Sequence, residues 1–327
     1  MRETNRATAN SELDMPMFSV IMPCYNHVRY VDQAVSSVRD QSCNCWELLV
    51  IDDGSTDGSA EKVQAHADQD VRIRLIRQSR NAGPAAARNA GLVAARGDWL
   101  AFLDSDDVWY PTTLDAYRKA ITRRPAASFF YGRRDRLDAS GAIQKGPVQF
   151  QDHPTGTAEL FGRMFLSTMV VCFARSLLDR TDTFDEGLRS CEDYELFLRL
   201  SLLTEFHPIA VSTGLRRRHE ENISRQTGFS RFQEAEVLRR FVRLQGGGEV
   251  LSDAMVSRRL ARLYYASGRQ YLKTGLPRKA LVALRESIRY RRNVKASLMK
   301  AVCGILPSLG SDDGRDIPWL TDRDREN

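Results

Sequence analysis

The chain has 327 residues, of which 42% are hydrophobic and 28% charged, and its formal net charge at pH 7 is +6. These values are typical of a globular protein with one large domain and a second, smaller one. The sequence has no run of about 18 apolar residues, which argues against an ordinary transmembrane helix, and residues 1–14 lack the apolar core of a signal peptide. The six cysteines lack the paired spacing of a metal finger, so we expect reduced thiols in a cytosolic protein.

Strand and helix patterns alternate along the first third of the chain. Short apolar runs that predict strands occur at 18–22, 46–51, 73–76 and 99–103, and helical patterns occur at 30–39, 59–67 and 85–95. This alternation is typical of an α/β fold with a mostly parallel sheet flanked by helices.

The pattern changes beyond Asp107. A further strand is predicted at 128–132, helices at 159–166 and 193–203, and an almost wholly helical segment from about residue 232. We therefore predict four regions: a disordered tail over 1–15, a sheet-based domain over 16–230, a helical domain over 231–310 and a polar tail over 311–327.

Positive charge is concentrated in the predicted helical domain. Residues 231–300 contain 17 Lys and Arg against 5 Asp and Glu. Such an excess is typical of a solvated helical surface, and it would also attract an anionic lipid surface or polymer. No nucleic-acid-reading module accompanies the charge, so nucleic acid is not an expected partner.

Acidic residues follow two of the predicted strands. The run at 99–103 ends in Asp104, Asp106 and Asp107, and the run at 46–51 ends in Asp52 and Asp53. In open α/β sheets the carboxyl ends of the strands carry the ligand-binding groups. Carboxylates so close together repel one another, and a divalent cation with oxygen ligands, Mg²⁺ or Mn²⁺, would relieve that repulsion.

Five motifs in a fixed order identify a family. They are VIMPCYN at 20–26, VIDDGSTD at 50–57, NAG at 81–83 with ARN at 87–89, LDSDD at 103–107, and ED at 192–193. In order and spacing the chain from about Phe18 to Ser224 resembles family 2 glycosyltransferases of the GT-A fold. The resemblance implies an inverting, metal-dependent transfer from a nucleotide-diphosphate sugar to a hydroxyl of a saccharide or lipid-linked acceptor, in polysaccharide or glycolipid biosynthesis.

The resemblance also assigns the residues that bind the nucleotide sugar. Asp53 matches the position that accepts a hydrogen bond from the uracil N3–H, so a UDP-sugar is the expected donor. For Asp53 and Asp52 the alternative role is helix capping, and for Tyr25 it is packing. Arg88 either reaches the nucleotide or pairs with an acid of the cluster. The expected set is Pro23, Tyr25, Asn26, Asp52, Asp53, Gly83, Arg88 and Asp104.

The metal and the base are assigned in the same way. Asp106 is the expected direct metal ligand, and Asp104 binds the ribose or the metal through water. His219, in a basic segment that resembles a loop over the donor diphosphate, completes the metal site or contacts phosphate, although a lone histidine is also commonly structural. Asp193 is the expected general base and Glu192 its support, with helix capping as the alternative.

The helical C-terminal part carries weaker signals. Tyr264, Gly268, Tyr271 and Ala280 lie at the spacing of a single degenerate tetratricopeptide helix pair. The segment 295–309 suits a helix on an anionic membrane surface, or equally one packed on that hairpin. We expect a cytoplasmic protein, or a peripheral one on the inner face of the cell membrane, and the alternative function is a catalytically inactive nucleotide-sugar-binding scaffold.

Overall fold

The computed structural model describes residues 15–138, 140–146, 153–217, 227–292 and 294–305. The chain divides into two compact units, residues 1–222 (unit 1) and 223–327 (unit 2). The predicted boundary, after residue 230, differs from this division by eight residues and falls inside a helix that starts at Thr227. The tails predicted at the two ends lie almost entirely outside the described residues.

The first half of unit 1 is a parallel βα arrangement, as predicted. Its strands pair in the order β3-β2-β1-β4, and every pair is parallel. The strands are β1 (Phe18–Cys24), β2 (Trp46–Asp52), β3 (Ile73–Arg77) and β4 (Trp99–Phe102), and the connecting helices are α1 (Val31–Arg39), α2 (Ser59–Ala67) and α3 (Pro84–Ala94). Parallel strands end at the same edge of the sheet, so the acids that follow β2 and β4 meet there.

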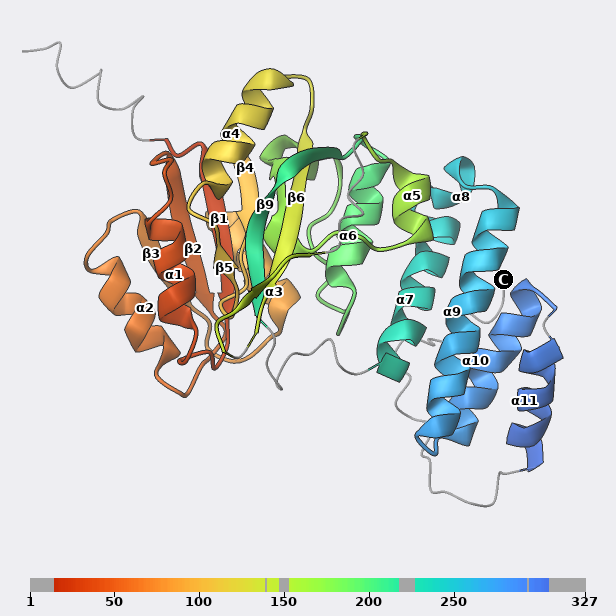
Figure 1. The fold of residues 1–327 in the computed structure, drawn as a ribbon. Coiled ribbons are helices and arrows are strands. Elements are labelled where there is room, and N and C mark those ends of the chain that lie inside the picture. Colours follow the sequence, from red (N-terminus) through yellow and green to blue (C-terminus); the bar gives the residue numbers. More distant parts are fainter. Residues whose placement is uncertain (1–14, 139, 147–152, 218–226, 293, 306–327) are drawn as a thin grey trace, which may run out of the picture. The chain divides into compact units, whose positions relative to one another are not determined.

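The second half of the sheet is mixed rather than parallel (Figure 1). Its strands are β5 (Val108–Trp109), β6 (Phe129–Leu137), β7 (Ile143–Gln144), β8 (Val171–Ala174) and β9 (His207–Arg217). β8 runs antiparallel to both β4 and β6, while β9 runs parallel to β6 and antiparallel to β5. Among its described residues, the chain between β6 and β8 contains β7, the short helix α5 (Thr157–Gly162) and a 3-10 turn. Antiparallel neighbours need no long helical crossover.

Helices cover both faces of the sheet. On one face α1 and α4 (Thr113–Arg123) bury Val35, Val38 and Tyr117 in the main apolar core. On the other face α3 lies so close to β1 that a Cβ on Gly91 would come within 2.5 Å of the Ile21 side chain. α6 (Glu192–Ser201) also covers this second face, where Phe197 packs edge-on against an aromatic cluster centred on Phe129. The two covering layers fix the loops at the carboxyl edge between them.

Unit 2 is helical. Its elements are α7 (Thr227–Leu244), α8 (Gly247–Val250), α9 (Asp253–Lys273), α10 (Pro277–Tyr290) and α11 (Val294–Ile305). α9 and α10 form a tight hairpin, since a Cβ on Gly268 would meet the Leu284 side chain at 2.7 Å and Tyr264 stacks on Tyr290. The tetratricopeptide likeness of this hairpin stays a prediction. Within the described part of the chain, none of the helices combines the length and apolar character needed to cross a bilayer.

Candidate active site

The loops after β1 and β2 are joined through Asn26. This residue has a positive φ of 53°, a conformation that asparagine adopts more readily than most residues. The Asn26 N–H donates to Ser55 Oγ at 3.0 Å, and the Thr56 N–H donates to Asn26 Oδ1 at 2.9 Å. Tyr25 beside it is 42% exposed, which disfavours the core-packing alternative and leaves the ring accessible at the sheet edge.

Asp53 is held by the turn that precedes α3. The carboxylate is buried and accepts hydrogen bonds from the N–H groups of Ala82 at 2.9 Å and Gly83 at 2.8 Å. Gly83 has a φ of 93°, which glycine adopts without steric cost. Each carboxylate oxygen has a second lone pair, so Asp53 can still accept a hydrogen bond from a ligand.

Helix capping is not the role of Asp53 or Asp52 in this structure. The first turn of α2 is capped by Asp57, whose Oδ1 accepts from the Ser59 N–H at 3.0 Å. Asp52 accepts a longer bond from the Ser55 N–H, at 3.3 Å. Burial raises the pKa of Asp53, and the charge of Asp52 raises it further, while the bonds from Ala82 and Gly83 lower it.

Arg88 joins the two acidic motifs. Its Nη2 donates to Asp104 Oδ1 at 2.9 Å and its Nη1 donates to Glu192 Oε1 at 2.8 Å. Arg88 is buried, and its Cζ lies 5.6 Å from the centroid of the Phe184 ring. The structure thus shows the predicted pairing of Arg88 with an acid of the cluster, while its contact with the nucleotide stays a prediction. The pairing brings α3, the end of β4 and the start of α6 together.

The carboxylates after β4 form a concentration of negative charge. Burial raises the pKa of Asp107 well above its usual value, and the charges of Asp106 and Asp104 raise it further. The backbone N–H of Arg217, at the end of β9, donates to Asp107 Oδ1 at 2.8 Å. The Arg217 Nε donates to the Asp106 carbonyl oxygen at 3.0 Å, so β9 closes on this loop.

These carboxylates fit a divalent cation that also binds a diphosphate. Across the ranges that the structure describes, no three potential metal-ligating side chains gather at one place. Mg²⁺ in phosphate-transfer sites is commonly held by one or two carboxylates together with substrate phosphates and water. Asp106 and Asp104 match that pattern, whereas His219 lies outside the described residues.

Glu192 and Asp193 open helix α6 on a strained turn. Cys191, which precedes them, has a φ of 64°, an uncommon conformation for a residue with a Cβ. Asp193 Oδ1 accepts from the adjacent Tyr194 N–H at 2.7 Å. The pKa of Asp193 is raised to about 6: burial is the largest cause and the charge of Glu192 adds to it, while Arg88 acts in the opposite direction. A carboxylate with a pKa near neutrality is well suited to accept a proton.

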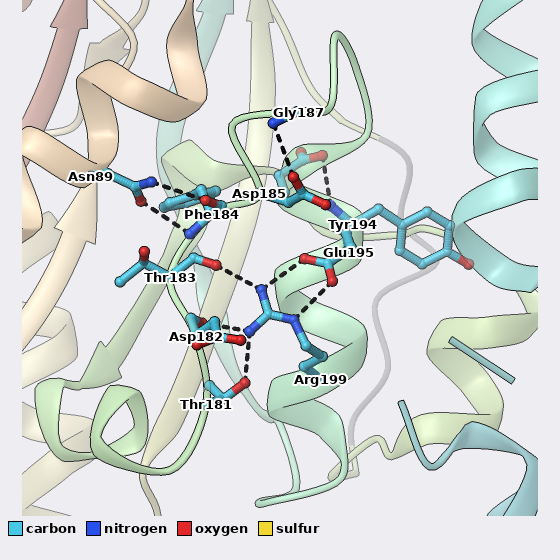
Figure 2. A network of polar contacts seen from close by, with 11 residues as sticks. Asn89, Thr181, Asp182, Thr183, Phe184, Asp185, Gly187, Tyr194, Glu195 and Arg199 are labelled. Atoms are coloured by element: carbon cyan, nitrogen blue, oxygen red, sulfur yellow. Dashed lines mark hydrogen bonds and ion pairs between the residues drawn. The ribbon is translucent and has the colours of Figure 1, made fainter. Parts of the chain in front are cut away.

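Arg199 fixes the segment that leads into α6 (Figure 2). Its guanidinium donates to Thr181 Oγ1 at 2.6 Å, to the Thr183 carbonyl at 2.7 Å and to Glu195 Oε2 at 2.7 Å. Sequence reasoning missed this network, although Glu195 and Arg199 have the i, i+4 spacing of a helical ion pair. The network holds the N-terminal turn of α6, and with it Asp193, against the preceding loop.

Asn89 provides a second anchor for the same loop. Its Nδ2 donates to the Phe184 carbonyl at 2.9 Å, and its Oδ1 accepts from the Phe184 N–H at 3.0 Å (Figure 2). Asn89 follows Arg88 in α3, so one helix turn binds both the loop before α6 and the first residue of α6. This is the physical role of the ARN motif in the described structure.

Comparison with known proteins establishes the family. Residues 19–182 match the family model described as glycosyl transferase family 2. The chain belongs to this family. A relative from Escherichia coli, the UDP-Glc:alpha-D-GlcNAc-diphosphoundecaprenol beta-1,3-glucosyltransferase WfgD, is 30% identical over 270 residues, which are 82% of this chain and 97% of that protein. Two other relatives, 50% and 41% identical, align over only 38% and 46% of their own length.

Solved structures confirm the fold of this family 2 member. Staphylococcus aureus TarS 1–349 in complex with UDP-GlcNAc aligns with a TM-score of 0.64 and 21% identity, over 86% of this chain and 83% of that chain. The mannosyltransferase PcManGT from Pyrobaculum calidifontis, in complex with GDP-Man and Mn²⁺, aligns with a TM-score of 0.52 and 18% identity, over 89% and 80%. Both likenesses support the predicted GT-A architecture.

Proposed function

We propose that this protein is an inverting glycosyltransferase that moves a sugar from a UDP-sugar to a hydroxyl group of a lipid-linked saccharide. One observation carries the proposal: the Arg88 guanidinium binds Asp104 of the predicted donor-binding motif and Glu192 of the predicted base motif at the same time. In a direct displacement the donor phosphates and the acceptor hydroxyl must lie close together. The two ion pairs of Arg88 hold the motif predicted for the donor close to the motif predicted for the base.

The UDP part of the proposal rests on Asp53. Its anchored carboxylate has spare acceptor capacity and no donor, which suits the N3–H of uracil. The remaining nucleotide-binding candidates lie in or next to the same loops. They are Pro23, Tyr25, Asn26, Asp52 and Gly83. The WfgD relative is a UDP-Glc-dependent glucosyltransferase by name, and the TarS structure contains UDP-GlcNAc.

Asp193 is the proposed general base. With a pKa of about 6, its carboxylate is ionised at neutral pH and can take the proton of the acceptor hydroxyl. The freed oxygen attacks the anomeric carbon as the bond from that carbon to the diphosphate oxygen breaks. UDP leaves with the electron pair of that bond, and the configuration of the sugar inverts in a single displacement. Glu192 keeps Arg88 in place beside the base.

A divalent cation, Mg²⁺ or Mn²⁺, is proposed for the diphosphate. Asp106 would hold it directly and Asp104 through water, with donor oxygens completing the coordination; His219 remains a further candidate ligand. When bound, such a cation stabilises the charge that develops on the departing diphosphate.

The lipid-linked acceptor is proposed from the WfgD relative, which is named as acting on a diphosphoundecaprenol-linked sugar. On the same ground we propose that the protein works in the cytoplasm, at the inner face of the cell membrane. The 17 basic residues over 231–300 would favour contact of unit 2 with an anionic lipid surface.

The test is donor turnover. A panel of UDP-, GDP- and dTDP-sugars is incubated with the full chain and Mg²⁺ or Mn²⁺, first with water and then with lipid-linked saccharides as acceptor. We expect one UDP-sugar to turn over, with loss on chelation, and we expect Asp193→Asn to lower kcat about 10²- to 10⁴-fold without weakening UDP binding. The matched control, Asp68→Asn at an exposed position, should leave kcat unchanged. UDP-sugar binding without turnover on any acceptor would favour the inactive scaffold instead.

A further inference from the structure

The proposed metal ligands lie in a tight turn that follows β4. The Asp107 N–H donates to the Asp104 carbonyl oxygen at 3.0 Å and closes this turn. Ser105 lies within it and is fully buried, whereas Asp104 and Asp106 on either side of Ser105 are partly exposed. A contact that fixes the Ser105 side chain therefore also fixes the backbone that carries both proposed ligands.

The Ser105 side chain is held by His27. His27 Nδ1 lies 2.7 Å from Ser105 Oγ, although 78 residues separate the two in the chain. Depending on its tautomer, the imidazole accepts the serine O–H at Nδ1 or donates from that nitrogen. His27 follows Asn26 in the loop after β1, so this hydrogen bond joins the loop proposed for the nucleotide to the turn proposed for the metal.

The backbone of His27 is itself anchored. Its N–H donates to Ser59 Oγ at 2.9 Å, and its carbonyl oxygen accepts from the N–H groups of Tyr30 and Val31, both at 2.9 Å. Ser59 is the first residue of α2 and is fully buried. An anchored side chain loses less conformational freedom when it makes a hydrogen bond. His27 is therefore a fixed support for Ser105.

The other side of the turn is held from β9. Arg217 binds the Asp107 carboxylate through its backbone N–H and the Asp106 carbonyl through its side chain. Its Cζ lies 5.1 Å from the centroid of the Tyr30 ring, and the centroid of the His27 ring lies 6.2 Å from the same centroid. The two supports of the turn thus come together at Tyr30.

We propose that His27 is a positioning residue for the metal site: through Ser105 it holds the Asp104–Asp107 turn in the conformation that binds a divalent cation together with the donor diphosphate. The proposal rests on the proposed function and extends it, because it names a residue that prepares the metal site without being a ligand. Groups that orient metal ligands raise metal affinity, since less reorganisation is needed when the cation binds.

The test compares the affinity of the full chain for UDP in Mn²⁺ with its affinity in a chelator, both measured by calorimetry. We expect Mn²⁺ to strengthen UDP binding by the parent protein. His27→Ala should reduce this enhancement about three- to tenfold, which is the effect of one hydrogen bond. UDP affinity in the chelator should stay as in the parent, because the Asp53 contacts do not involve His27.

Two further substitutions at residue 27 separate the Nδ1 contact from the mere presence of a polar side chain. The amide of an asparagine can occupy the place of the imidazole Nδ1, whereas the amide of a glutamine occupies that of Nε2. An amide carries both a donor and an acceptor, so it can replace either tautomer. His27→Asn should therefore keep the Mn²⁺ enhancement of the parent, and His27→Gln should lose as much as His27→Ala.

A double-mutant cycle tests whether His27 acts through Ser105. Ser105→Ala should reduce the Mn²⁺ enhancement as much as His27→Ala does, and the double variant should lose no more than either single one. The matched control is His66→Ala, which removes a histidine whose ring contacts Asp32 and Arg39 between α1 and α2. It should show the enhancement of the parent.

The pattern of losses decides between the outcomes. An unchanged enhancement in His27→Ala would overturn the inference. An equal loss of UDP affinity with and without Mn²⁺ would also overturn it, since His27 would then support the nucleotide loop. If Mn²⁺ does not affect UDP binding by the parent, the inference fails, while turnover of a UDP-sugar would leave the sugar transfer standing. Failure of UDP to bind the parent at all would remove both proposals. If His27→Ala does not fold, as judged by its thermal transition, the comparison of His27→Asn with His27→Gln decides.

Discussion

The two halves of unit 1 hold their functional side chains in different ways. In the half built on β1 to β4, short loops that follow parallel strands position them, and Asp53 is anchored by backbone N–H groups 29 and 30 residues away. In the half built on β5 to β9, contacts between distant elements position them. Arg88, in α3 of the first half, reaches Glu192 across 104 residues, and Arg217 reaches Asp107 across 110.

This difference separates binding from chemistry. The first half can form the proposed nucleotide-binding loops from turns at one sheet edge, whereas the proposed base site requires α3, β4, β9 and α6 to be in place together. Substitutions at the long-range contacts should therefore damage both stability and catalysis, and those in the loops should have smaller and more local effects.

The largest expected effect is that of Arg88→Met. It removes a buried guanidinium from between Asp104 and Glu192, whose side chains are only 33% and 12% exposed. Leaving two such carboxylates unpaired should lower the free energy of unfolding by about 3–5 kcal/mol, measured by urea denaturation. Arg77→Met, which breaks an exposed pair with Glu61, should cost less than about 1 kcal/mol. Equal losses in the two variants would contradict the distinction between the halves.

The pH dependence of the reaction should be the next largest effect. Asp193 has a raised pKa of about 6, so below this pH it is protonated and cannot take the acceptor proton. We expect kcat/KM to fall about tenfold for each pH unit below 6, and to level off above about 7. Because Arg88 lowers this pKa, Arg88→Met should move the acid limb to higher pH wherever the variant remains folded. A flat profile between pH 5 and 7 would argue against Asp193 as the base.

The smallest effect is expected in the loop half, at Asn26. Asn26→Gly keeps the positive φ but loses the side-chain acceptor for the Thr56 N–H, which should cost about 0.5–1.5 kcal/mol. Asn26→Ala adds the strain of a left-handed conformation, so it should be less stable than Asn26→Gly by about 1 kcal/mol. Chemical denaturation of the two variants measures that difference directly. Equal stability would mean that the loop rearranges, and that its conformation is less fixed than the Asn26 contacts indicate.

Much of the first half could be predicted from the sequence because its signals are local. Apolar runs of strand length, helical periodicity and the turn residues Gly83 and Pro84 each act within a few positions, and they predicted β1 to β4 and α1 to α3 closely. The acids after β2 and β4 could be grouped because parallel strands end at one edge. β9 was missed, since its residues carry no clear alternation and its pairing with β6 contains register shifts.

The sequence by itself determined the family, the parallel half of the sheet and the meeting of the acids after β2 and β4 at one edge, because these depend on short motifs and on strand ends. Only the tertiary structure decided that Arg88 joins Asp104 to Glu192, and that Arg199 and Asn89 fix the loop before α6. The physical reason is that an ion pair or an electrostatic field depends on distance in space, and side chains a hundred residues apart give no sign of that distance until the sheet and its helices have packed.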